Sequence, residues 1–124
     1  MEPQASAKLL GWGRFAIGVG MLAAPGLATR GWIGADADRT GTQVVTRAFG
    51  AREALLGFIQ AHVASRPGVG ARTVQALAVC DAIDAVISLA ARRQLPPSGV
   101  AMITAVAGSA AISGTLTARR LPQV

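Results

Sequence analysis

The stretch SGVAMITAVAGSAAISGTLTARR, residues 98–120, decides which class of fold this chain adopts. It places about 20 uncharged and mostly small or apolar residues before two terminal arginines, enough for a helix to cross a hydrocarbon core of roughly 30 Å. Ser98 is a suitable residue to cap the start of such a helix. The stretch therefore predicts a transmembrane helix.

Three further segments have the length and the apolar character of helices, and short joints rich in Gly, Pro or charged residues separate them. They cover residues 9–28, 43–65 and 73–93. Pro25 is expected to kink or end the first of them. Residues 29–42, TRGWIGADADRTGT, are expected to form a loop with Trp32 at the membrane interface. The prediction is an all-α, up-down bundle of four transmembrane helices with both termini on the same side.

The composition favours a membrane over water. Hydrophobic residues make up 52% of the 124 residues and charged residues only 15%, against about 25% charged residues in a typical soluble domain. Gly and Ala are abundant, which suits close packing of helices in lipid. A chain of this length forms one domain, residues 1–124, and we expect it in the lipid bilayer of a bacterial cytoplasmic membrane. A soluble helical protein is the alternative.

The formal charge of +6 does not predict a nucleic-acid partner, because the basic residues are scattered at segment edges and form no basic face. Four spans would place five basic residues on the side of the termini and four on the other side, a small difference for the positive-inside rule. Insertion in both orientations stays open, and with it an antiparallel homodimer. His62 and Cys80 each stand alone, so neither a metal site nor a cofactor is expected.

Two acidic residues interrupt the apolar segment CDAIDAVISLAARR, residues 80–93. At about 100° per residue, Asp81, Asp84 and Ser88 share one face of this helix. In the preceding helix Glu53 belongs to a stripe of small and polar residues that can approach another helix closely. The stripe consists of Thr46, Gly50, Glu53, Gly57 and Gln60. An antiparallel turn near Gly68 brings Glu53 level with the acidic pair, so the sequence predicts three carboxylates at one depth.

Arginines are expected to neutralise these carboxylates. A charge at the centre of a bilayer costs about 2.5 to 3.5 kcal/mol on insertion scales, so ion pairing or proton uptake is expected there. Crowded carboxylates cannot all ionise, and one of the three is therefore expected to hold a proton. The predicted catalytic residues are Asp81, Asp84 and Glu53, and the predicted substrate-binding residues are Arg47, Arg52, Ser88 and Arg14.

The motifs TRAFGAREALLGF, residues 46–58, and CDAIDAV, residues 80–86, resemble a pattern in small, mainly actinobacterial membrane proteins that form a domain family of unknown function. In that family a second helix with an Arg-x-x-Gly-x-Arg core precedes a third helix with an Asp-x-x-Asp pair. The matching positions are Arg47, Gly50, Arg52 and Glu53, followed by Asp81 and Asp84. The resemblance implies a four-helix membrane fold and supplies no activity.

Three classes of function are compatible with an interior site of carboxylates and arginines. The first is acid-base chemistry, such as isomerisation, cyclisation or epoxide opening, on a lipophilic small molecule. The second is a small proton- or ion-coupled transporter, and the third is a non-catalytic subunit of a membrane complex with a structural salt-bridge network. A large enclosed cavity bordered by the three carboxylates would favour the first class, and a solvent path to both sides would favour the second. Fully paired charges without a cavity would favour the third.

Overall fold

The regular structure of the chain is entirely helical over residues 2–124, the part that the computed structural model describes, and no strand is present there. The elements are α1 (Pro3–Ala23), α2 (Pro25–Ile33), the short 3₁₀ helix η1 (Gly34–Asp38), α3 (Thr40–Val63), α4 (Val69–Ala90) and α5 (Pro97–Arg120). The prediction of an all-α fold is confirmed.

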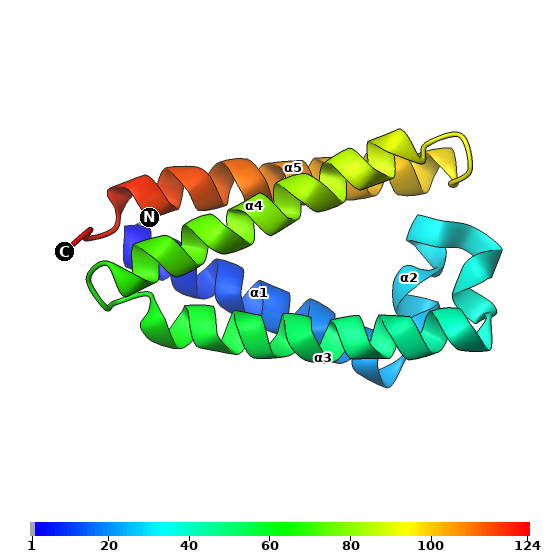
Figure 1. The fold of residues 1–124 in the computed structure, drawn as a ribbon, viewed down its shortest axis with the longest axis horizontal. Coiled ribbons are helices and arrows are strands. Elements are labelled where there is room, and N and C mark those ends of the chain that lie inside the picture. The colour runs from blue at the N-terminus through cyan, green and yellow to red at the C-terminus, as the bar shows by residue number, and fades with distance from the viewer. Residues whose placement is uncertain (1) are drawn as a thin grey trace.

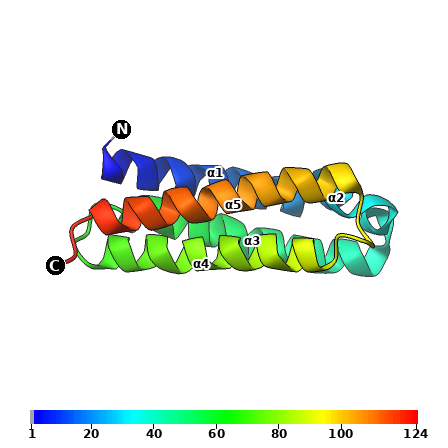
Figure 2. The same ribbon diagram turned by 90° about the horizontal axis from the view of Figure 1, so that it is seen from above.

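The four long helices run alternately in opposite directions, and both ends of the chain lie at the same end of the bundle (Figure 1). We call this end the terminal end and the opposite one, where α2 lies, the α2 end. The closest packing is that of α1 on α3 and of α4 on α5, so the bundle consists of two antiparallel pairs. Seen from above, the axes of all four long helices lie roughly along the same line of the molecule, its long axis (Figure 2). The two pairs meet at the terminal end and diverge toward the α2 end (Figure 1).

The segment after the first long helix differs from the expectation in part. Pro25 separates two helices, as expected: α1 ends at Ala23, and Pro25 becomes the first residue of α2, where its missing N–H costs nothing. The loop expected over residues 29–42 is wrong, because α2, η1 and the start of α3 occupy it. Its charged residues indicated exposure to water, and a short helix on the surface satisfies that need as well as a loop does.

Glycines lie at the contact between α1 and α3. A Cβ atom added at Gly11 would lie 2.8 Å from the backbone oxygen of Gly57, and one added at Gly50 would lie 2.7 Å from the backbone oxygen of Gly18. Neither position therefore accepts a larger residue without movement of the backbone. Close approach through small residues is typical of helices that associate in lipid, where packing replaces the hydrophobic driving force.

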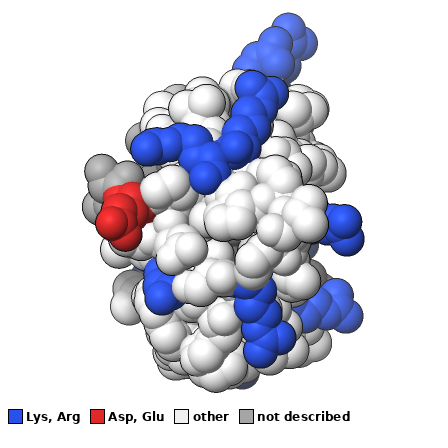
Figure 3. Space-filling view, turned by 90° about the vertical axis from the view of Figure 1, so that its left-hand side faces the viewer, with Lys and Arg blue, Asp and Glu red and all other residues white. Residues whose placement is uncertain are grey.

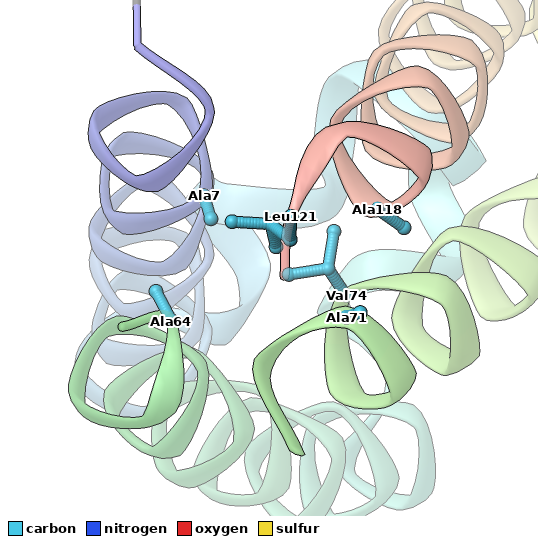
Figure 4. Close-up of a cluster of buried hydrophobic side chains, with 6 residues drawn as sticks. All are labelled: Ala7, Ala64, Ala71, Val74, Ala118 and Leu121. Atoms are coloured by element: carbon cyan, nitrogen blue, oxygen red, sulfur yellow. The ribbon is translucent and has the colours of Figure 1, made fainter. Parts of the chain in front are cut away.

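Small side chains close the bundle at its terminal end. A buried cluster there joins α1, α4 and α5 with the residues that follow α3 and α5 (Figure 4); its members are Ala7, Ala64, Ala71, Val74, Ala118 and Leu121. Two hydrogen bonds support it. Gln60, which is 1% exposed, donates from Nε2 to Ala7 O at 2.9 Å, and Gly68 N–H donates to Pro122 O at 2.8 Å. This cluster of buried apolar side chains thus lies at the terminal end of the molecule.

Large apolar side chains are exposed along the outside of every long helix; examples are Ile17, Val45, Ile59, Val86, Ile112 and Leu116. By length and composition, α4 and α5 are the two helices of residues 2–124 able to cross a membrane. Within their apolar windows only 33% of α4 and 22% of α5 is buried by the rest of the chain. The core helix of a water-soluble protein is mostly buried, whereas most of the apolar surface of α4 and α5 is exposed.

Basic side chains are concentrated at the ends of the bundle. Figure 3 looks onto the terminal end, where Lys and Arg side chains surround a mostly uncharged surface. The exposed basic residues of this end are Lys8, Arg66, Arg72, Arg119 and Arg120, and those of the α2 end are Arg30, Arg39, Arg92 and Arg93. Positive charges at both edges of an apolar surface are the pattern expected of a helix bundle that is anchored between two layers of lipid headgroups.

Candidate functional site

Arg14 links three helices in the interior of the bundle. It projects from α1, where Nη1 donates to Glu53 Oε1 of α3 at 2.5 Å and Nη2 donates to Asp81 Oδ2 of α4 at 2.6 Å. The side chains of Arg14, Glu53 and Asp81 are 10%, 15% and 12% exposed, respectively. Charge-assisted hydrogen bonds of this length are the strong ones in proteins. We call these three residues the Arg14 triad.

The triad contains two of the three carboxylates that the sequence places at one depth. The predicted stripe of α3 lies inside: Thr46, Gly50, Gly57 and Gln60 are buried, and Glu53 is partly buried. In α4, Asp81 and Ser88 are buried and Asp84 is partly buried on the same face. These face assignments are confirmed. They follow from the period of the helix together with the short turn between α3 and α4.

Two of the three predicted binding arginines lie elsewhere. Arg47 is exposed, and its Nε donates to Leu22 O at 3.3 Å. Arg52 is exposed too, and no residue in the described part of the chain forms an ion pair with it. The expectation that both arginines belong to the interior site is therefore wrong. Because α3 turns its glycine stripe toward α1, its arginines project outward, and side chains of that length reach polar surroundings from there.

Asp84 lies one turn beyond Asp81 on the same face of α4, and no group among residues 2–124 donates a hydrogen bond or forms an ion pair to it. Its side chain borders empty space instead. A carboxylate in this position is costly as an anion, since neither a cation nor a hydrogen-bond donor of the chain compensates its desolvation. Asp84 is therefore chemically distinct from Glu53 and Asp81.

A cavity of about 610 Å³ begins at the triad and runs mainly between α1 and α5. Its polar wall consists of Arg14, Glu53, Asp81 and Asp84, together with Ser109 and Ser113. The rest of its wall is apolar, and Leu9, Ile17 and Val106 continue from it onto the exposed outer surface. An apolar ligand therefore has a route between α1 and α5 to four ionisable side chains.

A second cavity, of about 530 Å³, lies under α2 and beside the beginning of α3. Its wall contains three threonines, Thr29, Thr42 and Thr46, and otherwise mainly apolar residues. Four residues line both cavities; they are Met21, Trp32, Phe49 and Asp84. Asp84 is the one charged residue of this shared wall, so it is accessible from both sides.

Trp32 and Ser88 hold α2 in place. Trp32 Nε1 donates to Ser88 Oγ at 3.1 Å, and Ser88 is 1% exposed. Ser88 lines neither cavity, so the structure gives it a packing role and does not place it where a ligand could bind. Trp32 is partly buried, because α2 folds back at this end of the bundle and its indole is turned toward α4. The sequence carried no signal for this, since Trp at a helix end is also typical of an interface.

The remaining candidate residues lie apart from the cavities. Cys80 is a free, exposed thiol, and His62 stacks on Phe58 with ring centroids 4.0 Å apart. Trp12 contacts both of these rings edge-on, which makes an aromatic cluster on the outer face of α1 and α3. Within residues 2–124, no three His, Cys, Asp or Glu side chains are arranged to hold a metal ion.

Comparison of the chain with protein-family models, with curated proteins and with solved structures finds no match. The Arg14 triad, Asp84 and the two cavities are therefore the features of the chain that bear on its function.

Proposed function

We propose that the chain is an integral membrane protein of four spans that performs acid-base chemistry on a lipophilic small molecule, with Asp84 as the proton donor and acceptor. One observation carries the proposal: Asp84 is a carboxylic acid without a partner, and it lies on the wall of a cavity that lipid-soluble molecules can enter. Pockets with mostly apolar walls and a few convergent polar groups are the usual sites for small ligands.

The exposed apolar residues on the outside of all four long helices support four membrane spans. α4 and α5 have the length and composition of spans, and α1 and α3 are of similar length with exposed apolar residues along them. The charges that lower the hydropathy of α1 and α3 include Arg14 and Glu53, which neutralise each other inside. The same fold is what the likeness of residues 46–58 and 80–86 to small actinobacterial membrane proteins implies, and we propose that kinship on those motifs.

The hydrogen bonds of Arg14 distinguish two carboxylates, Glu53 and Asp81, from the third, Asp84. Arg14 donates to both Glu53 and Asp81, so each of these buried carboxylates has a cationic hydrogen-bond donor. Asp84 has no such donor, and the two neighbouring anions disfavour a third negative charge. Asp84 is therefore the group that holds a proton at neutral pH and can deliver it to a bound ligand.

Isomerisation or cyclisation needs no further reactant at such a site. Asp84 donates its proton to an alkene carbon or an ether or epoxide oxygen as the positive charge develops in the ligand. Loss of a different proton from the ligand returns Asp84 to its acid form, so protons balance over one cycle. The anionic Glu53 and Asp81 stabilise the positive charge during the step, because the surroundings have a low dielectric constant.

The structure favours this proposal over the other two classes. A transporter needs a path to both sides, but the cavities end before the buried cluster at the terminal end. A purely structural network leaves no carboxylate free, whereas Asp84 is outside the triad. The features that remain are those of a ligand site.

The test compares the lipid extracts of cells that express the native chain, Asp84→Asn or Asp36→Asn. Asp36 is an exposed acid of η1 that lines neither cavity, so its variant is the matched control. An isomerase converts one lipophilic compound into another of equal mass, which chromatography coupled to mass spectrometry separates by retention time. The native chain and Asp36→Asn should produce the same new species, and Asp84→Asn should not. Identical extracts from native and Asp84→Asn cells would refute the proposed chemistry.

A further inference from the structure

The position of Asp84 between two cavities limits the shape of the ligand. On one side lies the cavity between α1 and α5, and on the other lies the cavity under α2. The other three residues of the shared wall, Met21, Trp32 and Phe49, are apolar or nearly so. A polar group that reaches Asp84 therefore has apolar space on both sides of it.

Both cavities are suited to apolar parts of a molecule. Their volumes, about 610 and 530 Å³, each lie within the range of pockets that hold whole small ligands, roughly 300 to 1,000 Å³. In the smaller cavity the hydroxyl of Thr29 donates to Pro25 O at 2.7 Å, so its proton is already used. Neither cavity offers a second cation or a free acid beyond the residues already described.

We propose that the ligand occupies both cavities at once, and that it is a lipophile whose reacting oxygen or double bond lies inside the molecule with an apolar arm on each side. This inference rests on the proposed function, in which Asp84 contacts the reacting group. A molecule with its polar group at one end, such as a free fatty alcohol, would fill one cavity and leave the other empty. An internal functional group, as in a mid-chain alcohol, an epoxidised acyl chain or a polyprenyl epoxide, places apolar surface in both.

Two isomeric alcohols serve as probes, because hexadecan-8-ol and hexadecan-1-ol differ only in the position of the hydroxyl group. The reporter is Trp32, which lines both cavities; the Trp12→Phe background leaves Trp32 as the only tryptophan. Titration of this protein in detergent should shift the emission of Trp32. We expect half-saturation by hexadecan-8-ol at a concentration about tenfold lower than for hexadecan-1-ol, since burying two more methylenes changes affinity by about that factor.

Two glycines allow each cavity to be filled separately. Gly13 lines only the larger cavity and Gly41 only the smaller one, and a Cβ added at either position meets no atom within 4 Å. The matched control is Gly20, which lines neither cavity and has equally open surroundings. Gly13→Phe and Gly41→Phe should each lower the affinity for hexadecan-8-ol by about tenfold or more, and Gly20→Phe should leave this affinity unchanged. The affinity for hexadecan-1-ol should be lowered by only one of these two cavity-filling variants.

The outcomes separate this inference from the proposed function. Equal affinity for the two alcohols would overturn the proposal that one ligand occupies both cavities. So would a loss of hexadecan-8-ol affinity in Gly13→Phe without any loss in Gly41→Phe. Either result leaves the proposed function intact. Absence of any response of Trp32 to either alcohol would overturn ligand binding at Asp84, and the proposed function with it. Thermal unfolding of each glycine variant confirms that it is folded before its titration is interpreted.

Discussion

Arg14 and Asp81 are separated by 67 residues in the chain, yet Arg14 Nη2 lies 2.6 Å from Asp81 Oδ2 inside the bundle. Arg14 belongs to the α1–α3 pair and Asp81 to the α4–α5 pair, so this ion pair fastens the two pairs to each other. A cluster of mostly alanine side chains also joins the two pairs at the terminal end. Stability of the assembled bundle should therefore depend strongly on a single arginine.

Replacement of Arg14 by Met should destabilise the fold, because it leaves Glu53 and Asp81 as buried carboxylates without a partner. Removal of one member of a buried ion pair costs about 3 to 5 kcal/mol. The midpoint of thermal unfolding in detergent should fall accordingly. The triple variant Arg14→Met, Glu53→Gln, Asp81→Asn should recover most of the loss, since no unpaired charge remains in it. A midpoint for Arg14→Met equal to that of the native chain would contradict the role of the triad.

Enlargement of Gly50 should separate α1 from α3. The Cβ of Gly50→Leu would lie 2.7 Å from Gly18 O, so the helices must move apart, and overpacking of this kind costs about 1 to 3 kcal/mol. Gly20→Leu adds the same side chain where nothing lies within 4 Å, and it should leave the unfolding midpoint unchanged or higher. Thermal unfolding of the two variants, followed by circular dichroism, makes the comparison. Equal midpoints for both would show that this contact tolerates side chains.

The two tryptophans should differ in their contact with lipid. Trp12 is 44% exposed on the outer face of α1, whereas Trp32 is turned inward and bonded to Ser88. In vesicles of brominated phosphatidylcholine, the Trp32→Phe variant, which retains Trp12, should lose much more fluorescence than the Trp12→Phe variant. Loss of the hydrogen bond to buried Ser88 should also cost Trp32→Phe about 1 kcal/mol of stability. Equal quenching of the two variants would place α2 in lipid, in conflict with the fold.

Four spans can be tested by the accessibility of cysteines to a reagent that does not cross membranes. The Cys80→Ala background removes the native thiol, and Gln94→Cys and Val124→Cys then introduce single thiols at opposite ends of α5. In sealed vesicles of one orientation, only one of the two should react before detergent is added. Reaction of both thiols in full from outside would show that α5 does not cross the bilayer. Reaction of each thiol by half would indicate insertion in both orientations.

Much of the interior could be predicted from the sequence, because helical period and chain order are local properties. Gly50, Glu53 and Gly57 fall on one stripe of α3, and the short turn at Gly68 fixes the level of Glu53 against Asp81. Each of these steps uses spacing within one helix or across one turn. The depth of the carboxylates followed from them without any knowledge of packing.

The partner of these carboxylates could not be predicted in the same way. Arg14, Arg47 and Arg52 are equal in charge and similar in position along their helices, and only the pairing of α1 with α3 decides that Arg14 faces inward. The position of Trp32 depends on how α2 folds back after Pro25, which is again a tertiary property. The cavities are spaces between elements, and no periodicity describes them.

The division into two helical pairs has a consequence for the order of assembly during synthesis. The α1–α3 pair is made first, and it already contains both Arg14 and Glu53, so its interior charges cancel before α4 exists. The α4–α5 pair brings Asp81 and Asp84 and no interior cation of its own. In the proposed membrane topology α4 is inserted with two carboxylates that no cation of its own pair neutralises, and docking of Asp81 against Arg14 then orients the second half of the protein on the first.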